Sequence, residues 1–400
     1  MTRHTHPYLI VLLAAVIATT PLAVDMYLPA MPNIARDLHT HIGTVQQSLS
    51  IFLAAYGGGM LLFGPLADSI GRRPLALFGL GGFTLSSIAL ALVTEPHLFL
   101  GLRALQAFCG AAATVVVPGF IRQLYQEHTA KGMSYLSMMM MLAPLLAPSI
   151  GSVILWFSDW RSIFTVLALY GAMILLLVWK WLPEITPLHK TDSSPSSVRS
   201  GFFSGYKIVF SNRKARPMIM TMVFGSFSFF CFITGVSFLY IHYYGVSEQT
   251  FSVLFGLNVI CLMTANLINS RLVSRLGSLK MLRSGLAIAL LSSLALCAVS
   301  FWHQPLVWTV VCIGILMGSL ALISTNADAI VLMNFPHNTG TATAVNGTLR
   351  FSSGAVAGPL LAYFYTGTAM PFALLMLSGV IAVALCQIWY LFLQKKLLIE

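Results

Sequence analysis

The chain reads Gly64-Pro65-Leu66-Ala67-Asp68-Ser69-Ile70-Gly71-Arg72-Arg73-Pro74 between two long apolar runs. The G-x-x-x-D-x-x-G-R-R spacing predicts a tight turn between two helices, because glycine permits backbone conformations and close approaches that other residues do not. Asp68 can meet an arginine or the amino end of a helix, and such a contact would act as a charge latch that opens and closes. We therefore predict a gating role for Gly64, Asp68, Gly71, Arg72 and Arg73.

The composition around this turn indicates a membrane protein. The 400 residues are 58% hydrophobic and only 8% charged, with a mean hydropathy of +0.85. Soluble domains carry about 25% charged residues, because their surface is solvated. A spanning helix needs about 20 mostly apolar residues. The sequence predicts an all-α membrane protein with twelve transmembrane helices, at 8–28, 44–64, 74–93, 98–121, 133–156, 162–182, 218–241, 250–270, 279–301, 306–329, 341–365 and 370–393.

Six of these runs precede a long polar stretch and six follow it. The stretch 184–216 is rich in Ser, Pro and basic residues, which cannot bury enough apolar area to fold alone. We expect an N-terminal six-helix half at 1–183, a cytoplasmic linker at 184–216 and a C-terminal half at 217–400. The turn recurs as Ser270-Arg271-Leu272-Val273-Ser274-Arg275-Leu276-Gly277, with Ser274 at the place of Asp68 and a shift of 206 residues. This match predicts two six-helix pseudo-repeats.

The net charge of +11 comes from basic residues that gather in alternate loops. With the N-terminus inside, the opposite loops hold only Arg36 and Arg161, so we expect both termini in the cytoplasm. Basic loops face anionic lipid, which makes membrane lipid the expected partner and nucleic acid none. The first apolar run is longer than the 7–15 residues of a signal-peptide core and is expected to remain as a helix. The six cysteines show neither CxxC nor metal-ligand spacing, so no disulfide framework, metal or cofactor is expected.

The turn resembles the signature loop of the major facilitator superfamily. A narrower resemblance covers nearly the full chain, because three stretches are similar to motifs of the Bcr/CflA family of drug:proton antiporters: Asp25–Pro32, Arg103–Gln106 and Leu142–Gly151. The resemblance implies a major facilitator fold in a bacterial inner membrane, a monomer, alternating access, and export of small amphipathic compounds in exchange for protons. The third stretch resembles the antiporter signature, in which Pro and Gly kink a helix. It adds Pro144, Pro148 and Gly151 to the predicted gating residues.

Two features depart from the family pattern. The fourth predicted span ends in Arg122-Gln123, where the family often has Arg-Asp, which puts the partner of Arg72 or Arg73 in question. The second departure is the presence of two charged residues, Asp328 in the tenth predicted span and Arg350 in the eleventh, where the family is usually uncharged, which would mark a different substrate.

Charged side chains inside the spans are the strongest pointers to function, because each costs about 2.5–3.5 kcal/mol or more at the bilayer centre. Asp25 and Arg103 both fall in the outer half of the membrane and would pair if their spans adjoin. A carboxylate can hold a proton when isolated and release it when a cation approaches. We predict that Asp25 and Arg103 couple transport to protons, the alternative being a static ion pair. Arg350, near mid-depth, is a candidate for recognising substrate charge or a partner of Asp328.

A transport cavity needs apolar walls with a few converging polar groups. The predicted substrate-binding residues are Tyr27, Tyr56, Gln106, Phe230, Asn258, Asn326 and Arg350. Each of them could instead be a helix-packing contact. The favoured function is a proton-coupled exporter of a small molecule. The alternatives are a proton-coupled permease for a nutrient such as a nucleoside or sugar, and a channel or receptor without proton coupling. No GxxxxGK[ST] stretch is present, which argues against an ATP-driven pump, and nothing indicates an enzyme.

The predicted orientation is tested by Ser194→Cys in a chain depleted of its own cysteines. An impermeant thiol reagent should leave this residue unlabelled in intact cells and label it after permeabilisation, because the linker is expected in the cytoplasm. Thr94→Cys, between the third and fourth predicted spans, is the control and should be labelled in intact cells. Labelling of Ser194→Cys from outside would contradict the topology.

Overall fold

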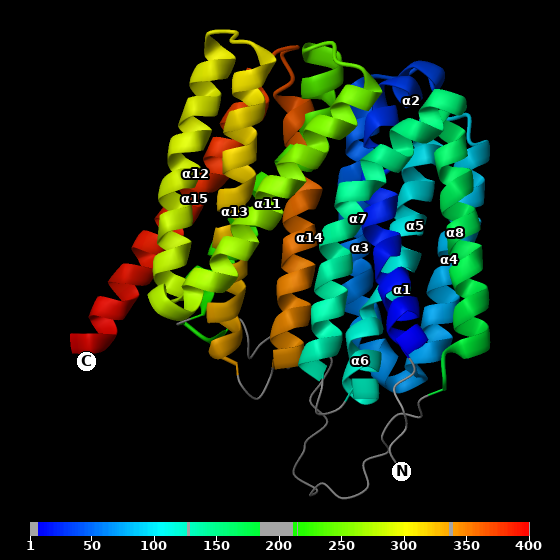
Figure 1. Ribbon diagram of the computed structural model, residues 1–400, viewed down its shortest axis with the longest axis horizontal. Helices are drawn as coiled ribbons and strands as arrows, with labels where there is room; N and C mark the ends of the chain where they lie inside the picture. Colours follow the sequence, from blue (N-terminus) through cyan, green and yellow to red (C-terminus); the bar gives the residue numbers. More distant parts are fainter. Residues whose placement is uncertain (1–6, 126–128, 185–210, 214, 336–338, 400) are drawn as a thin grey trace, which may run out of the picture. The chain divides into compact units, whose positions relative to one another are not determined.

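The computed structural model describes residues 7–125, 129–184, 211–213, 215–335 and 339–399, and every regular element within them is a helix (Figure 1). The chain forms two compact units, Met1–Val198 and Arg199–Glu400. The linker 184–216 lies almost wholly outside the described residues.

The first unit contains six spans, two of them broken. Its elements are α1 (Pro7–Asp25), the short 3-10 helix η1 (Leu28–Ala30), α2 (Met31–Asp37), α3 (Ile42–Ile70), α4 (Arg72–Leu92), α5 (Pro96–Val115), α6 (Val117–Tyr125), α7 (Thr129–Phe157) and α8 (Trp160–Trp181). Helix α5 packs against α3 and α4, α4 packs against α8, and α1 packs against α7.

The second unit repeats this plan. Its elements are α10 (Arg216–Ser237), the π-helix η3 (Phe238–Tyr243), α11 (Glu248–Leu276), α12 (Ser278–Phe301), α13 (Leu306–Met333), α14 (Thr339–Tyr363) and α15 (Met370–Ile399). Helix α10 packs against α13, α14 and α15, while α13 also packs against α11 and α12.

The predicted fold class is confirmed. Within the described residues, eleven helical segments are long and apolar enough to cross a membrane. Helix α14 is the more polar twelfth, with 25 residues that include Asn346 and Arg350. Several predicted boundaries were too short, because the helices continue beyond their apolar parts. The eighth span was expected at 250–270, for example, and its helix α11 runs over Glu248–Leu276.

The first span bends where its proline residues fall. Helix α1 ends at Asp25, and the chain turns through Met26 and Tyr27 before η1 begins. Pro29 has no backbone N–H, so it cannot donate the helical hydrogen bond to the Asp25 carbonyl four residues earlier. The break places the Asp25 carboxyl group at a helix end inside the unit.

The repeated turn has the same backbone in both units. Helices α3 and α11 each contain 29 residues. Each ends at a glycine with positive φ, Gly71 at 103° and Gly277 at 81°, and both have ψ of 151°. These conformations are strained for residues with a Cβ, which explains why glycine recurs in this register.

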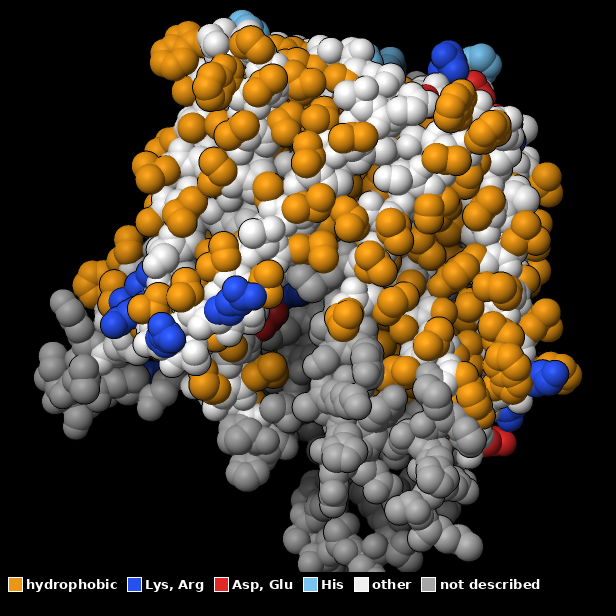
Figure 2. Space-filling model, viewed as in Figure 1, with side chains coloured by type: hydrophobic (Ala, Val, Ile, Leu, Met, Phe, Trp, Pro, Cys, Tyr) orange, Lys and Arg blue, Asp and Glu red, His pale blue; other side chains and the backbone are white. Residues whose placement is uncertain are grey.

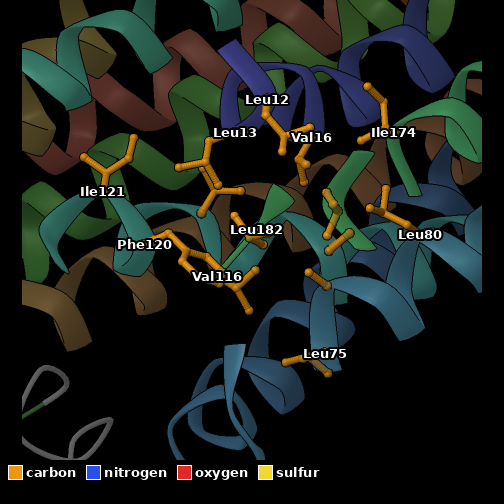
Figure 3. Close-up of a cluster of buried hydrophobic side chains, with 14 of the residues drawn as sticks. Leu12, Leu13, Val16, Leu75, Leu80, Val116, Phe120, Ile121, Ile174 and Leu182 are labelled. Carbon is orange, nitrogen blue, oxygen red and sulfur yellow. The ribbon is translucent and has the colours of Figure 1, made fainter. Parts of the chain in front are cut away.

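Apolar side chains cover the helices inside and out. Figure 3 shows one interior cluster of the first unit, where Leu13 and Val16 of α1 meet Leu80 of α4, Phe120 of α6 and Ile174 of α8. Figure 2 shows hydrophobic side chains spread along the outer faces of the helices, while Lys and Arg gather towards helix ends. A hydrophobic exterior of this kind is expected for helices surrounded by lipid.

Helices α4 and α5 approach closely at one glycine. A Cβ at Gly79 would lie 2.6 Å from the Cys109 carbonyl oxygen and 3.0 Å from the carbonyl carbon of Ala112. Two residues along the same helix, a Cβ at Gly81 would meet nothing within 4 Å. Small residues at such crossings let helix backbones touch, which is a main source of packing energy in membranes.

This pair of glycines gives a matched stability test. Gly79→Ala should lower the melting temperature of the purified protein, because the obstructing atoms belong to the α5 backbone and cannot rotate away. Gly81→Ala should leave the melting temperature unchanged or raise it. Alanine is the better helix former, by about 0.5–1 kcal/mol in unfolding free energy. Thermal unfolding in detergent measures both. Equal effects of the two substitutions would contradict the close crossing.

Candidate functional site

Asp25 is a buried acid at the end of α1. Its side chain is 3% exposed, and its Oδ1 atom has no hydrogen-bond partner within the described structure. A buried charge without a partner is unfavourable by several kcal/mol. A carboxyl group in this position is therefore most stable in its neutral, protonated form.

Arg103 of α5 is completely buried among aromatic rings. Its guanidinium carbon lies 4.3 Å from the ring centroid of Tyr27 and 4.5 Å from that of Phe52, and 5.9 Å from that of Phe164. Aromatic faces attract cations, by about 2 kcal/mol or more where water is excluded. These rings come from the turn after α1, from α3 and from α8, so one guanidinium holds three other spans.

A chain of hydrogen bonds orients the same guanidinium. Arg103 Nη1 donates to Gln106 Oε1 at 2.6 Å, and Gln106 Nε2 donates to Ser87 Oγ at 2.8 Å. Ser87 Oγ donates in turn to the Phe83 carbonyl of its own helix, α4, at 2.7 Å. The Nε and Nη2 atoms of Arg103 are buried and have no acceptor among the described residues. The arginine therefore keeps donors available inside the unit.

The ion pair between Asp25 and Arg103 is not formed in this structure. The spans do adjoin, because α1 packs against α5. The ion pairs of the described residues nevertheless do not join the two, and the ring of Tyr27, two residues after Asp25, lies beside the guanidinium. The expectation of direct pairing was therefore wrong here. An acid and a base stand in one unit, each with an atom that has no hydrogen-bond partner among the described residues.

Two of the predicted substrate-binding residues lie at this cluster. Tyr27 is completely buried and its hydroxyl shares a hydrogen bond of 3.1 Å with Ser48, while Gln106 bonds Arg103 as described. Tyr56 lies one turn beyond Phe52 and stacks on it, with its hydroxyl 2.7 Å from Thr114 Oγ1. All three make contacts within the first unit, and their contact with a substrate remains a prediction.

The predicted gating residues divide between two places, the turn after α3 and the helix α7. At the turn, Arg72 lies against α6, so close that a Cβ at Gly119 would be 2.6 Å from its Nε. Arg73 donates to the Trp179 carbonyl at 2.6 Å and lies 4.0 Å from Glu184.

The space around Gly64 is open. A Cβ at this position would meet only Cγ2 of Val115, at 4.0 Å, so the glycine leaves room between α3 and α5. The side chains of Asp68, Arg122 and Gln123 lie outside the described part, so the latch itself stays a prediction.

The proline-rich stretch of α7 packs directly on the Asp25 turn. Pro144 and Pro148 both lie inside α7. A Cβ at Gly151 would overlap the carbonyl oxygen of Met26, the residue that follows Asp25. Helix α7 and the segment that carries the buried acid are therefore in close backbone contact at this crossing.

In the second unit the predicted residues occupy separate contacts. Asn258 Nδ2 donates to the Tyr240 hydroxyl at 3.1 Å, and Asn326 Nδ2 donates to Asn269 Oδ1 at 2.7 Å. The ring of Phe230 packs against Phe351 at 5.8 Å.

Arg350 and Asp328 form the ion pair that the sequence left open. Arg350 Nη2 lies 2.5 Å from Asp328 Oδ2 and 2.9 Å from Ser324 Oγ. The pair joins α14 to α13.

Sequence reasoning missed the residues that hold the charged ones in place. They are Ser48, Phe52, Ser87, Phe164, Tyr240, Asn269 and Ser324. Aromatic and small polar residues are common in spanning helices, so their type alone gave no signal. Only the contact across helices distinguishes them.

A comparison with protein families matches residues 13–359 to the Major Facilitator Superfamily. The chain is 34% identical to a bicyclomycin resistance protein homolog of Haemophilus influenzae, over 94% of this chain and 93% of that protein. It is 30% identical to a chloramphenicol resistance protein of Pseudomonas aeruginosa, over 85% of this chain and 81% of that protein. Among solved structures it is similar to the xylose transporter XylE of E. coli, with a TM-score of 0.71, 13% identity and coverage of 94% and 96%. The last likeness concerns the fold alone.

Arg103→Lys tests the aromatic box, the three rings of Tyr27, Phe52 and Phe164 that surround the guanidinium. Lysine is a compact point charge that cannot face the rings and bond Gln106 with one planar group, so we expect a loss of about 2 kcal/mol in stability. The matched control is Arg161→Lys, since the Arg161 guanidinium lies 4.3 Å from the Trp160 ring but its side chain is 31% exposed. The control should lose about 0.5–1 kcal/mol. Thermal unfolding in detergent compares the two, and an Arg103→Lys loss no larger than the control's would contradict the role of the box.

Proposed function

Because the chain belongs to the Major Facilitator Superfamily and its relatives include resistance proteins of Bcr/CflA type, we propose that it is a proton-coupled exporter of small amphipathic compounds. The observation that carries the proposal is the buried carboxyl group of Asp25, which belongs to no ion pair of the described residues. Arg103, a buried arginine of the same unit, has two nitrogen atoms, Nε and Nη2, without an acceptor among the described residues.

Proton coupling needs an acid whose charge depends on the state of the carrier. Asp25 outside an ion pair holds a proton, because the neutral form avoids a buried charge. If a conformational change brings the available donors of Arg103 to Asp25, or admits water, the charged form becomes favourable and the proton leaves. A substrate that enters the same space can trigger that exchange. The carrier would thus bind proton and substrate in alternation.

The gating proposal follows from the contact of α7 with the first span. Gly151 lies against the Met26 carbonyl, so a tilt of α7 at Pro144 and Pro148 is transmitted to the Asp25 segment. We propose that the halves 1–183 and 217–400 rock about the linker 184–216 and that the Asp68 turn latches one of the two states. A ligand shifts such an equilibrium only through a difference in its affinity for the two states.

The remaining parts of the proposal concern the setting. The carrier works as a monomer in a bacterial inner membrane, surrounded by lipid, with both termini in the cytoplasm. The basic residues at the end of α11 and the start of α12, among them Arg275 and Lys280, would then face the cytoplasmic leaflet.

Asp25→Asn tests the coupling role. Asparagine is nearly isosteric but cannot exchange a proton. In inverted proteoliposomes, where the cytoplasmic face is outside, export appears as uptake into the lumen. We expect uphill uptake of chloramphenicol driven by a pH gradient alone to be lost in this variant. Downhill exchange of the same compound should survive, because the cavity is nearly unchanged. The control is Asp37→Asn. Asp37 belongs to the same span and accepts a hydrogen bond from Trp160 at 3.0 Å, but its side chain is 37% exposed. The control should retain uphill transport.

Three readings separate the outcomes of this test. A folded Asp25→Asn protein that still transports uphill at the normal rate would falsify the coupling role. A loss of melting temperature together with a loss of all flux would assign Asp25 a structural role instead. If wild-type protein moves none of a panel of amphipathic antibiotics in either direction, the exporter proposal fails and a permease or channel is favoured.

A further inference from the structure

Gln106 meets the buried arginine of the first unit as a neutral acceptor. Its Oε1 accepts from Arg103 Nη1 at 2.6 Å, and both residues are completely buried. A guanidinium binds the two oxygens of a carboxylate along an edge that contains Nη2, together with either Nη1 or Nε. Nε and Nη2 are buried and have no hydrogen-bond partner within the described structure. The amide therefore leaves one two-donor edge free and the positive charge of Arg103 unneutralised.

The orientation of this amide is fixed from α4. Ser87 Oγ donates its one hydrogen to the Phe83 carbonyl at 2.7 Å, so only its lone pairs remain for Gln106. Gln106 Nε2 donates to that oxygen at 2.8 Å. Because the nitrogen end of the amide is held by Ser87, the oxygen end faces the arginine. Ser87 thus selects the acceptor end of Gln106 for Arg103.

The second unit contains the same helix crossing, and its glycines set the register of the repeat. A Cβ at Gly79 of α4 would lie 2.6 Å from the Cys109 carbonyl oxygen of α5. A Cβ at Gly285 of α12 would lie 3.1 Å from the Ser319 carbonyl oxygen of α13. Ser319 comes 210 residues after Cys109. The next contacts of the two glycines give the same difference, Ala112 and Leu322.

In this register the second unit has apolar residues at the places of the arginine and the glutamine. Arg103 corresponds to Ile313 and Gln106 to Leu316, and both apolar residues are completely buried. The crossing therefore forms without a charge or an amide. Apolar residues at buried polar positions are often neutral or stabilising. Arg103 and Gln106 are thus additions to the repeated frame, and they stand in the unit that carries the buried acid Asp25.

We propose that Gln106 is a positioning residue for proton coupling. It holds the Arg103 guanidinium with its Nε–Nη2 edge free and its charge unneutralised, so that the carboxylate of Asp25 takes that edge when the carrier changes state. The inference rests on the proposed function and gives Gln106 a role other than contact with substrate.

The neutrality of Gln106 is the physical requirement. A buried cation attracts an anion strongly, because the surrounding dielectric constant is low. With an amide as its partner, Arg103 keeps this attraction for a carboxylate that comes within reach, and the proton of Asp25 leaves to solvent as the contact forms. When the contact breaks, Gln106 still holds the guanidinium and Asp25 takes up a proton again. A permanent acid beside Arg103 would abolish this alternation.

Gln106→Glu and Gln106→Leu test the role, with the same two substitutions at Gln387 as matched controls. Gln387 of α15 is a buried glutamine that is 4% exposed, and its Nε2 donates to Thr221 Oγ1 at 2.8 Å and to Met218 Sδ at 3.6 Å. Neither partner is charged. Leucine is the residue that the second unit carries at the place of Gln106. All four full-length variants are purified and reconstituted in inverted proteoliposomes.

Thermal unfolding in detergent gives the first reading. Gln106→Glu should raise the melting temperature, because the arginine is already buried and gains a counter-charge at hydrogen-bond distance. Gln387→Glu should lower it, because a buried acid without a cation is unfavourable. A shift of both variants in the same direction overturns the inference.

The second reading is the ratio of uphill uptake, driven by a pH gradient alone, to downhill exchange, with chloramphenicol as the probe. Gln106→Leu should lower this ratio about tenfold, the effect of one hydrogen bond to a charged group. Gln106→Glu should lower it further, and Gln387→Leu should keep the wild-type ratio. A Gln106→Glu protein with the wild-type ratio overturns the inference, as do equal losses in Gln106→Leu and Gln387→Leu. If Gln106→Leu does not fold, Gln106→Glu decides, since it keeps an acceptor.

The outcomes separate this inference from the proposed function. If the wild-type protein exchanges chloramphenicol downhill but takes up none against its gradient, proton-coupled export fails. The unfolding data then decide on Gln106 alone: opposite shifts retain it as the residue that keeps Arg103 free, and parallel shifts reject it. If the wild-type protein and Gln106→Glu are equally coupled, the exporter stands and the positioning role falls.

Discussion

The burial of one guanidinium organises the first unit. Arg103 sits on α5, its rings come from the turn after α1, from α3 and from α8, and its hydrogen-bond chain ends on Ser87 of α4. A cation in hydrocarbon surroundings must find compensation inside the protein, because neither lipid nor water supplies it. Aromatic faces provide that compensation without adding a second charge. Five of the six spans are thereby held to one point, and Arg103 needs no ion pair with Asp25.

The two units treat their charges in opposite ways. In the first, Asp25 and Arg103 are buried and are not joined in an ion pair. In the second, Asp328 and Arg350 are paired and one-third exposed. An isolated acid suits the uptake and release of a proton, since its charge depends on what approaches it. Duplication of the fold has thus left two different chemical environments on related frameworks.

Close helix crossings give the framework its stiffness. Lipid tails are as apolar as leucine, so burial of apolar surface contributes little to helix association in a membrane. Contact between backbones takes its place, at Gly79 against α5 and at Gly151 against the Met26 carbonyl. The second crossing lies next to Asp25, which links the packing of α7 to the environment of the buried acid.

The sequence by itself determined the twelve helices, the two repeats and the identity of the charged residues inside the spans. Hydropathy shows helices directly because a membrane accepts few other structures, and Gly71 and Gly277 marked equivalent turns because only glycine suits their positive φ. Tertiary structure alone decided which partners those charges have. Nothing in the spacing of Asp25 and Arg103 showed that Tyr27 would lie at the guanidinium. The sequence offered the pairing of Asp328 with Arg350 only as one of two alternatives, and the structure shows that it forms. Such contacts depend on how helices distant in sequence rotate against each other, and a local pattern does not contain that rotation.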